Sequence, residues 1–369
     1  MIIGDRMNEV ALGILKKIKA HGYLAYLVGG YPRDLYIGRD SLDYDICTNA
    51  TPKELKEIFG DSILPTEQYG SVTLISQGMR FEITTFRKDI KYLNNRKPIE
   101  IEYIDNLLDD LKRRDFTMNT MCIDSDGIII DLLNGKEDID NKIIRTVGNA
   151  DLKIYEDSLR ILRAIRFATV LDFDLDEDLK QAIKKHGALL KNLSYYRKKE
   201  ELDKIFSSPN HMKGIKLIKE LELEEDLELS NLDNIVSTTY LIGIWAQVNV
   251  LNKYTFNNTE KESIIKINEL LDKDILNYNN LYNYGLYIST IVSEIKGIDK
   301  KIVNERYNNL YIHNKTDIKI EAKEICELLN RKPGKFLKEI FNDLEYKLVN
   351  KFFENNKDII KQYVLEYYL

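Results

Sequence analysis

The spacing of apolar residues divides the chain into a first part with mixed helix and strand patterns and a second part that is helical. Residues 7–20 carry apolar side chains at helical spacing, and this pattern stops at Gly22, a residue type that commonly ends helices. Residues 23–28 have the pattern of a short strand, which ends in Gly29 and Gly30. We therefore expect an opening helix, then a strand and a glycine pair.

Further helix and hairpin signals continue to about residue 150. Residues 51–54 form a helix start, with a capping threonine, a proline at the first helical position and a glutamate that completes a capping box. Residues 71–87 predict a hairpin that turns at Gln77-Gly78. Residues 120–133 predict a second hairpin, which turns at Asp126-Gly127.

Strand signals nearly vanish after residue 150. Helical patterns over residues 155–169, 176–186 and 194–206 are separated only by short polar breaks, and further helical patterns follow. The predicted fold class is therefore α+β, with a mixed sheet and helices in a head that is followed by an all-helical remainder.

Composition narrows the class of protein without naming a function. With 369 residues, 44% hydrophobic and 31% charged, the chain is expected to be globular and to form more than one packed unit. The most apolar window, residues 238–251, is too short to span a bilayer, so no membrane association is expected. The three cysteines lie far apart, which argues against a disulfide framework and favours a cytoplasmic protein. The net charge of −6 does not exclude an RNA enzyme, because local basic surface decides phosphate contact.

Two carboxylates suggest a metal site. Asp43 and Asp45 are two residues apart, and on a strand such residues point to the same face. Hard oxygen ligands of this kind suit Mg²⁺, which would assist attack of an RNA 3′-hydroxyl on an α-phosphate. Alone, such a pair is usually a solvated turn. Here the pair follows, by about a dozen residues, a strand that ends in Gly29 and Gly30. This combination resembles the DNA polymerase β nucleotidyltransferase superfamily.

The glycine pair and two further residues are candidates for the same site. Gly29 and Gly30 lack side chains, so their N–H groups could approach a triphosphate at the start of the next helix. Arg33 on that helix could contact phosphate. Glu82 lies on a later strand, where this superfamily often has a third catalytic carboxylate, although an outward-facing strand residue is an equal alternative.

The helix predicted over residues 155–168 has a charged arc opposite an apolar one. Asp157, Arg160, Arg163 and Arg166 lie on the charged arc, and Phe167 interrupts it without a role that the sequence explains. An ordinary solvated face with an Asp157–Arg160 ion pair would have the same pattern.

The chemistry of Asp157 and Arg160 offers a sharper hypothesis. A carboxylate only accepts hydrogen bonds and a guanidinium only donates them. Cytosine and adenine each present an amino donor beside a ring-nitrogen acceptor, whereas uracil and guanine reverse this pattern. The pair would therefore select C and A without a nucleic-acid template, and Arg163 and Arg166 would bind triphosphate or orient the pair.

An ordered series of motifs resembles the bacterial-type (class II) CCA-adding tRNA nucleotidyltransferases, which share their fold with bacterial poly(A) polymerases. Strong matches are LVGGYPRD with DYD, RRDFTMNT at residues 113–120, the segment 131–148 and EDSLR at residues 156–160; weaker ones are SYYRKKEEL at residues 194–202 and KPGK at residues 332–335. The chain departs from the family pattern at Pro32, Tyr196 and Lys199.

The resemblance implies a nucleotidyltransferase head at residues 1–150, a helical neck with the base-reading helix at 151–206, and a tRNA-binding body and tail at 207–369. It implies Mg²⁺ as cofactor, CTP, ATP and tRNA as substrates, and nucleotide binding by Arg114, Arg163 and Arg166. Lys and Arg of the tail, such as Arg331 and Lys332, are candidate RNA contacts or ordinary solvated charges. No protein partner is predicted.

The segment at residues 86–98 bears on specificity, because family members restricted to CC addition lack a flexible loop in this place. Its presence favours full CCA addition, with A-only addition or poly(A) synthesis as alternatives. A non-catalytic RNA-binding relative would be expected to lack Asp43 or Asp45. A small-molecule nucleotidyltransferase would have no reason to carry EDSLR or RRDFT.

Overall fold

The computed structural model describes residues 9–41, 43–65, 70–93, 97–248 and 250–369, which form two compact units. The first unit ends at Glu228 and the second begins at Leu229. The predicted head and neck both fall inside the first unit, and the finer three-part division stays a prediction. Among the described residues, no helix combines the length and the apolar character needed to cross a membrane.

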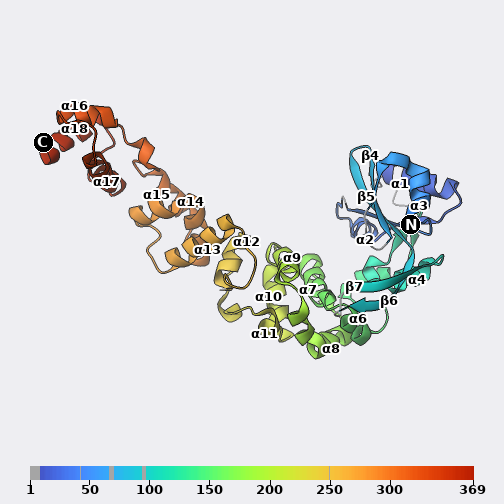
Figure 1. Ribbon diagram of the computed structural model, residues 1–369. Helices are drawn as coiled ribbons and strands as arrows, with labels where there is room; N and C mark the ends of the chain where they lie inside the picture. The colour runs from blue at the N-terminus through green and yellow to red at the C-terminus, as the bar shows by residue number, and fades with distance from the viewer. Residues whose placement is uncertain (1–8, 42, 66–69, 94–96, 249) are drawn as a thin grey trace. The chain divides into compact units, whose positions relative to one another are not determined.

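The elements of the head confirm the predicted mixture of helices and strands (Figure 1). They are α1 (Glu9–Ala20), β1 (Ala25–Val28), α2 (Gly30–Ile37), β2 (Tyr44–Thr48), α3 (Pro52–Phe59), η1 (Gly60–Ser62), β3 (Ile63–Pro65), β4 (Ser71–Ser76), β5 (Met79–Thr85), β6 (Arg87–Leu93), β7 (Lys97–Tyr103), α4 (Leu107–Lys112), η2 (Thr117–Asn119), β8 (Cys122–Ile123), β9 (Ile129–Ile130), α5 (Gly135–Asp140) and β10 (Ile143–Ile144).

A seven-stranded mixed sheet in the order β3-β4-β5-β2-β1-β8-β9 forms the centre of the head. Strands β2 and β5 are parallel, and the other neighbours are antiparallel. Side chains alternate between two cores: Leu27 and Ile46 join the core of α1 and α3, whereas Val28 and Cys47 join the core that includes Leu107 of α4. Because Asp45 is two residues before Cys47, it lies on the α4 side of the sheet.

Local signals placed several of these elements correctly. The capping box at Thr51 forms as predicted, since the Thr51 N–H donates to Glu54 Oε2 at 2.7 Å and the Glu54 N–H donates to Thr51 Oγ1. Both predicted hairpins form, as β4–β5 and β8–β9. The first turns at Gln77 and Gly78, which both have positive φ.

The segment expected as a loop at residues 86–98 is instead part of a β-hairpin, because β6 pairs with β7. The sequence carries a signal for it, since Ile99, Ile101 and Tyr103 alternate with glutamates at period two. Residues 94–96 lie outside the described residues.

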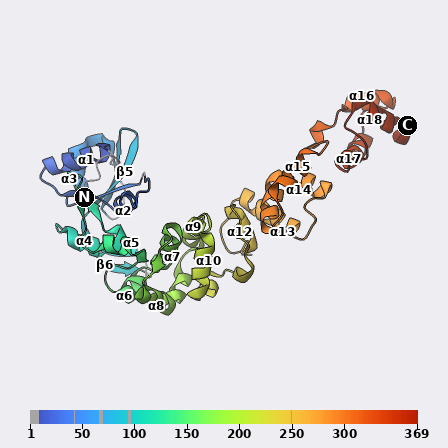
Figure 2. The same ribbon diagram turned by 180° about the vertical axis from the view of Figure 1, so that it is seen from behind.

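Helices dominate the rest of the first unit, as predicted. The elements are α6 (Ala150–Glu156), α7 (Leu159–Leu171), β11 (Asp174–Leu175), α8 (Glu177–His186), η3 (Gly187–Asn192), α9 (Tyr195–Phe206), α10 (His211–Glu220) and α11 (Glu224–Leu227). Helix α7 packs against both α9 and α10, and the view from behind shows the three side by side (Figure 2). The short strand β11, which follows α7, pairs with β10 of the head and so connects the end of α7 to the head.

The single helix predicted over residues 155–169 is wrong, because the chain breaks between α6 and α7. Asp157 has an extended backbone, with φ −142° and ψ 100°, and its Oδ1 accepts a hydrogen bond from the Leu159 N–H at 3.0 Å. A short polar side chain that bonds to a nearby N–H competes with the helical backbone, and this explains the break.

Every regular element among the described residues of the second unit is a helix. Its elements are η4 (Leu232–Asn234), α12 (Leu241–Gln247), α13 (Asn258–Leu271), α14 (Tyr278–Ile295), α15 (Lys300–Asn308), η5 (Lys315–Asp317), α16 (Ala322–Leu328), α17 (Phe336–Val349) and α18 (Lys357–Tyr368). Trp245 packs against Tyr254 and Phe256, and α16 to α18 enclose a core that includes Ile325 and Leu344. The KPGK segment is an exposed connection between α16 and α17.

Candidate active site

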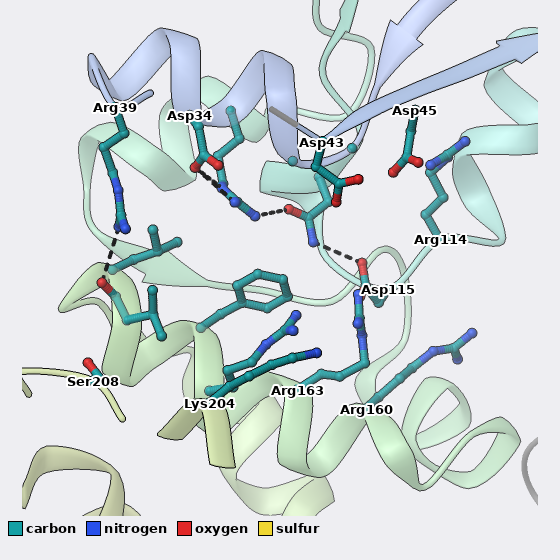
Figure 3. Close-up of a pocket in the computed structure, with 18 of the residues that line it drawn as sticks. Asp34, Arg39, Asp43, Asp45, Arg114, Asp115, Arg160, Arg163, Lys204 and Ser208 are labelled. Atoms are coloured by element: carbon teal, nitrogen blue, oxygen red, sulfur yellow. Dashed lines mark hydrogen bonds and ion pairs between the residues drawn. The ribbon is translucent and has the colours of Figure 1, made fainter. Parts of the chain in front are cut away.

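A cavity of about 1020 Å³ in the first unit collects most of the residues predicted to act on nucleotides. Its walls come from the start of α2, the residues around β2, the chain just before η2, helix α7 and the end of α9 (Figure 3). The predicted residues that line it are Gly29, Gly30, Arg33, Asp43, Asp45, Arg114, Asp157, Arg160, Arg163 and Arg166. Glu82 does not line it.

Asp43 and Asp45 lie at the N-terminal end of β2, the central strand of the sheet, where their negative charges repel each other. Asp43 is exposed just before β2, and Asp45 is partly buried within it. Burial, followed by the nearby Asp43 carboxylate, raises the pKa of Asp45 to about 6, although Arg114 pulls in the other direction. The surroundings of Asp45 therefore disfavour its charged form.

Gly29 lets the chain pass close to this carboxylate. Its φ of 84° is a conformation that side-chain-bearing residues rarely adopt, and a Cβ built there would lie 3.1 Å from Asp45 Oδ2. Gly29 is also the N-cap of α2, so the first N–H groups of that helix lie beside the two carboxylates.

Glu82 is the register partner of Asp45 across the parallel β2–β5 pair. Its side chain is exposed, and its charge contributes to the raised pKa of Asp45. A role as third catalytic carboxylate stays a prediction.

The two carboxylates fit a hard divalent cation by their chemistry. The described residues contain no group of three or more His, Cys, Asp or Glu side chains arranged to hold a metal ion. Asp43 and Asp45 would thus supply part of a coordination shell and leave positions for phosphate oxygens and water, which is how proteins usually bind Mg²⁺. A bound cation would also offset the repulsion between the two neighbouring carboxylates.

Arg114 is anchored by a fully buried carboxylate that sequence reasoning missed. Asp110 accepts hydrogen bonds from Arg113 Nε at 2.8 Å, from Arg114 Nη2 at 3.2 Å and from the Arg87 N–H at 3.1 Å. Burial by itself would lower the pKa of Arg114, but the nearby Asp110 carboxylate outweighs burial and raises this pKa. The Arg114 side chain is thereby held on the wall of the cavity near Asp45 (Figure 3).

A continuous chain of hydrogen bonds connects α2 to α7 across the cavity (Figure 3). Arg33 donates to Asp34 through Nε and Nη2 and to Asn119 Oδ1 through Nη1, at 2.7 Å. Asn119 in turn donates to Asp115 Oδ1 at 3.1 Å. Asp115 Oδ2 accepts from Nε and Nη2 of Arg163, at 2.9 and 2.6 Å.

Asp115 is the central member of this chain. Its side chain is 13% exposed, and burial by itself would raise its pKa. The Arg163 guanidinium and the hydrogen bonds from Asn119 and the Phe116 N–H outweigh burial and hold the pKa of Asp115 well below its usual range. Asp115 and Asn119 belong to the RRDFTMNT motif, so this motif already contained the signal.

Asp157 and Arg160 both reach the cavity wall, as the base-reading hypothesis requires. Arg160 is 6% exposed and donates to the carbonyls of Lys153 at 2.6 Å and Arg113 at 3.3 Å. It also donates to Glu156 Oε2 at 3.1 Å. Selection of bases by the Asp157–Arg160 pair stays a prediction.

The motif at residues 194–202 braces α7 through a residue that the sequence did not single out. Arg166 Nε lies 3.2 Å from Glu201 Oε2 of α9, and Glu201 also lies 3.7 Å from Lys204 Nζ. The departures from the family pattern have little bearing on this brace. Tyr196 is exposed, and Lys199 donates to Asp203 within α9.

Comparisons with known proteins agree with this geometry. The model of the poly A polymerase head domain matches residues 25–145, and a model of tRNA nucleotidyltransferase domain 2 matches residues 233–364. CCA-adding enzymes of Streptococcus agalactiae and Lactobacillus helveticus are 32% and 33% identical to this chain, with 97% and 99% of both chains covered. The crystal structure of Bacillus stearothermophilus CCA-adding enzyme in complex with CTP is 29% identical, with a TM-score of 0.79 over 97% of this chain and 96% of that one.

We predict that Asp115→Asn destabilises the protein by about 3 kcal/mol at pH 7, because it removes the counter-charge of the mostly buried Arg163 guanidinium. The folded-state pKa of Asp115 is depressed, so its contribution to stability is complete above the unfolded value of about 4 and is lost as the pH falls further. Urea unfolding between pH 7 and pH 3 should show a gap in the free energy of unfolding between parent and variant, and this gap should narrow below about pH 4. A gap that stays constant over this range would contradict the assignment.

Proposed function

The chain belongs to the CCA-adding enzymes, which are tRNA nucleotidyltransferases, and we propose that its cavity adds C, C and A in turn to the 3′ end of tRNA. The observation that carries the proposal is the shared cavity of Asp43, Asp45, Arg114 and Asp157, which come from distant parts of the chain. Carboxylates for a metal ion, a cation for phosphate and a candidate base reader are thus within reach of one nucleotide.

Members of this nucleotidyltransferase family generally use a divalent metal ion. We infer that Asp43 and Asp45 hold Mg²⁺, the ion that suits two carboxylates with open positions for phosphate and water. When bound, the ion would polarise the reacting α-phosphate and lower the barrier to in-line attack by the RNA 3′-hydroxyl. Glu82, beside Asp45 in the sheet, is proposed as a further carboxylate of this site.

The positive groups of the cavity are proposed to hold the triphosphate. Gly29 and Gly30 present backbone N–H groups at the start of α2 without obstruction by side chains. Arg33 and Arg163 are already fixed by the hydrogen-bond chain through Asn119 and Asp115, so little of their side-chain entropy remains to be lost on binding. Fixed donors of this kind would orient the α-phosphate toward the 3′-hydroxyl and stabilise the departing pyrophosphate.

Base selection is proposed to rest on Asp157 and Arg160. In the present structure Arg160 donates to two backbone carbonyls and to Glu156, so it would need to exchange some of these partners to pair with a base. Asp157 would accept from the amino group of cytosine or adenine, and Arg160 would donate to the neighbouring ring nitrogen. Uracil and guanine would leave these groups mismatched, which is costly once a bound base has displaced the water around them.

The second unit is proposed to bind tRNA. Its division into a body and a tail, which the sequence suggested, is part of this proposal. Its exposed cations in the connection after α16 and in the first turn of α17 are candidate phosphate contacts; they are Arg331, Lys332, Lys335 and Lys338. Such contacts read the shape and backbone of the RNA and not its sequence. The three cysteines are free and buried, which supports our proposal of a cytoplasmic location.

An extension assay tests this function. The purified protein is incubated with Mg²⁺ and tRNAs that end at the discriminator base, at C or at CC, with each NTP supplied separately. We expect CTP incorporation on the first two tRNAs and ATP incorporation on the third. Growth of CC ends alone would instead indicate A-only addition, long A tails would indicate poly(A) synthesis, and no growth on any tRNA would contradict the enzyme assignment.

Two variants separate chemistry from base selection in the same assay. Asp43→Ala should abolish turnover, because it removes a carboxylate from the proposed metal site. Asp157→Ala should retain part of the turnover but raise the ratio of UTP and GTP to CTP and ATP incorporation by about 10-fold, the worth of one lost charged hydrogen bond. If Asp157→Ala incorporates UTP and GTP no better than the parent, the base-reading proposal is wrong.

A further inference from the structure

Phe167, for which the sequence offered no role, lies at the centre of the charged wall of the cavity. Its ring is 8% exposed and lines the cavity together with Arg33, Arg163 and Arg166. The guanidinium carbons of these arginines lie 5.0, 5.4 and 4.2 Å from the ring centroid. These distances are within the range of cation–π attraction, which is about 6 Å.

The three arginines form a cluster of like charges whose mutual repulsion is unfavourable unless nearby groups offset it. Because each guanidinium lies close to the same ring, all three are within about one Debye length of one another, roughly 10 Å at 0.1 M salt. Burial, followed by the charges of Arg163 and Arg33, lowers the pKa of Arg166, although arginine remains protonated at neutral pH.

Each guanidinium has two stabilising neighbours of different kinds. Asp34, Asp115 and Glu201 each pair with one arginine, at 2.8, 2.6 and 3.2 Å respectively. The ring of Phe167 is the neighbour that all three share. Arg163 and Arg166 come from the same helix as Phe167, whereas Arg33 comes from α2, so the ring joins cations of two separate elements.

The ring is itself held in place. Phe116, a fully buried residue of the RRDFTMNT motif, meets Phe167 edge to face with 5.7 Å between the ring centroids and an angle of 82° between the ring planes. Edge-to-face contact directs the positive rim of one ring at the negative face of another and restricts rotation of both. Phe167 therefore has both a fixed orientation and a set of cations around it.

We propose that Phe167 is a positioning residue, whose ring gathers Arg33, Arg163 and Arg166 into one phosphate-binding set before the nucleotide arrives. The inference rests on the proposed function for its ligand, a nucleoside triphosphate. Loss of the ring face would remove the attraction that offsets the mutual repulsion of the three guanidiniums, so triphosphate affinity should fall and KM should rise, with less change in kcat.

The test replaces Phe167 by phenylalanines with one, two and three ring fluorines, which weaken the negative ring face stepwise at nearly constant size. Phe173, which follows the same helix and is 4% exposed, serves as the matched control, since the described part of the chain places no cation over its ring. Binding of inorganic tripolyphosphate in metal-free buffer and KM for CTP on tRNA are measured for each protein, together with the thermal unfolding midpoint.

We expect tripolyphosphate affinity to fall and KM to rise with each fluorine at Phe167, by about 10-fold over the whole series. Phe167→Leu, which removes the ring, should change both quantities by about the same amount. The unfolding midpoint should fall modestly with each fluorine and kcat should change little, whereas affinity and KM should stay constant across the Phe173 series. Equal effects at both positions, or no trend at Phe167, would overturn the proposal. A parent protein that binds tripolyphosphate but adds no nucleotide would contradict the proposed function and leave this inference standing.

Discussion

The carboxylate of Asp115 is the interaction on which the cavity depends. It lies between Arg163 of α7 and Asn119, and Asn119 passes the contact on to Arg33 of α2. A charge this far from water is stable only when it is paired and hydrogen-bonded, and Asp115 meets both conditions. Through this single group, the sheet-containing part of the first unit and helix α7 hold their phosphate-binding arginines toward one cavity.

Around this interaction the cavity is divided by charge. One wall carries the neighbouring carboxylates Asp43 and Asp45, with Arg114 close by. The facing wall carries arginines that are each paired once and share the ring of Phe167. A metal-bound triphosphate has the complementary pattern, with a cation at one end and anionic oxygens along its length, so the two walls together favour this class of ligand.

Much of this was predictable, because the signals were local. The glycine pair, the capping box at Thr51 and both hairpins depend on neighbouring residues, and the motifs marked most of the cavity lining. The helix break at Asp157 was missed because a side chain that caps a new helix also fits a helical pattern. Glu201 was missed because its partner Arg166 lies on another helix. Asp110 was missed although Arg113 and Arg114 are only three and four residues away, because its burial and its bond to the Arg87 N–H depend on the fold.

A double-mutant cycle between Asp115 and Arg163 tests the account most directly. CTP dissociation constants are measured for the parent, Asp115→Asn, Arg163→Gln and the double variant, with folding checked for each. If the pair acts as a unit, each single variant weakens binding and the double variant loses less than the sum, with a coupling of about 1–3 kcal/mol. Losses that simply add would show that Asp115 does not act through Arg163, and would contradict the account.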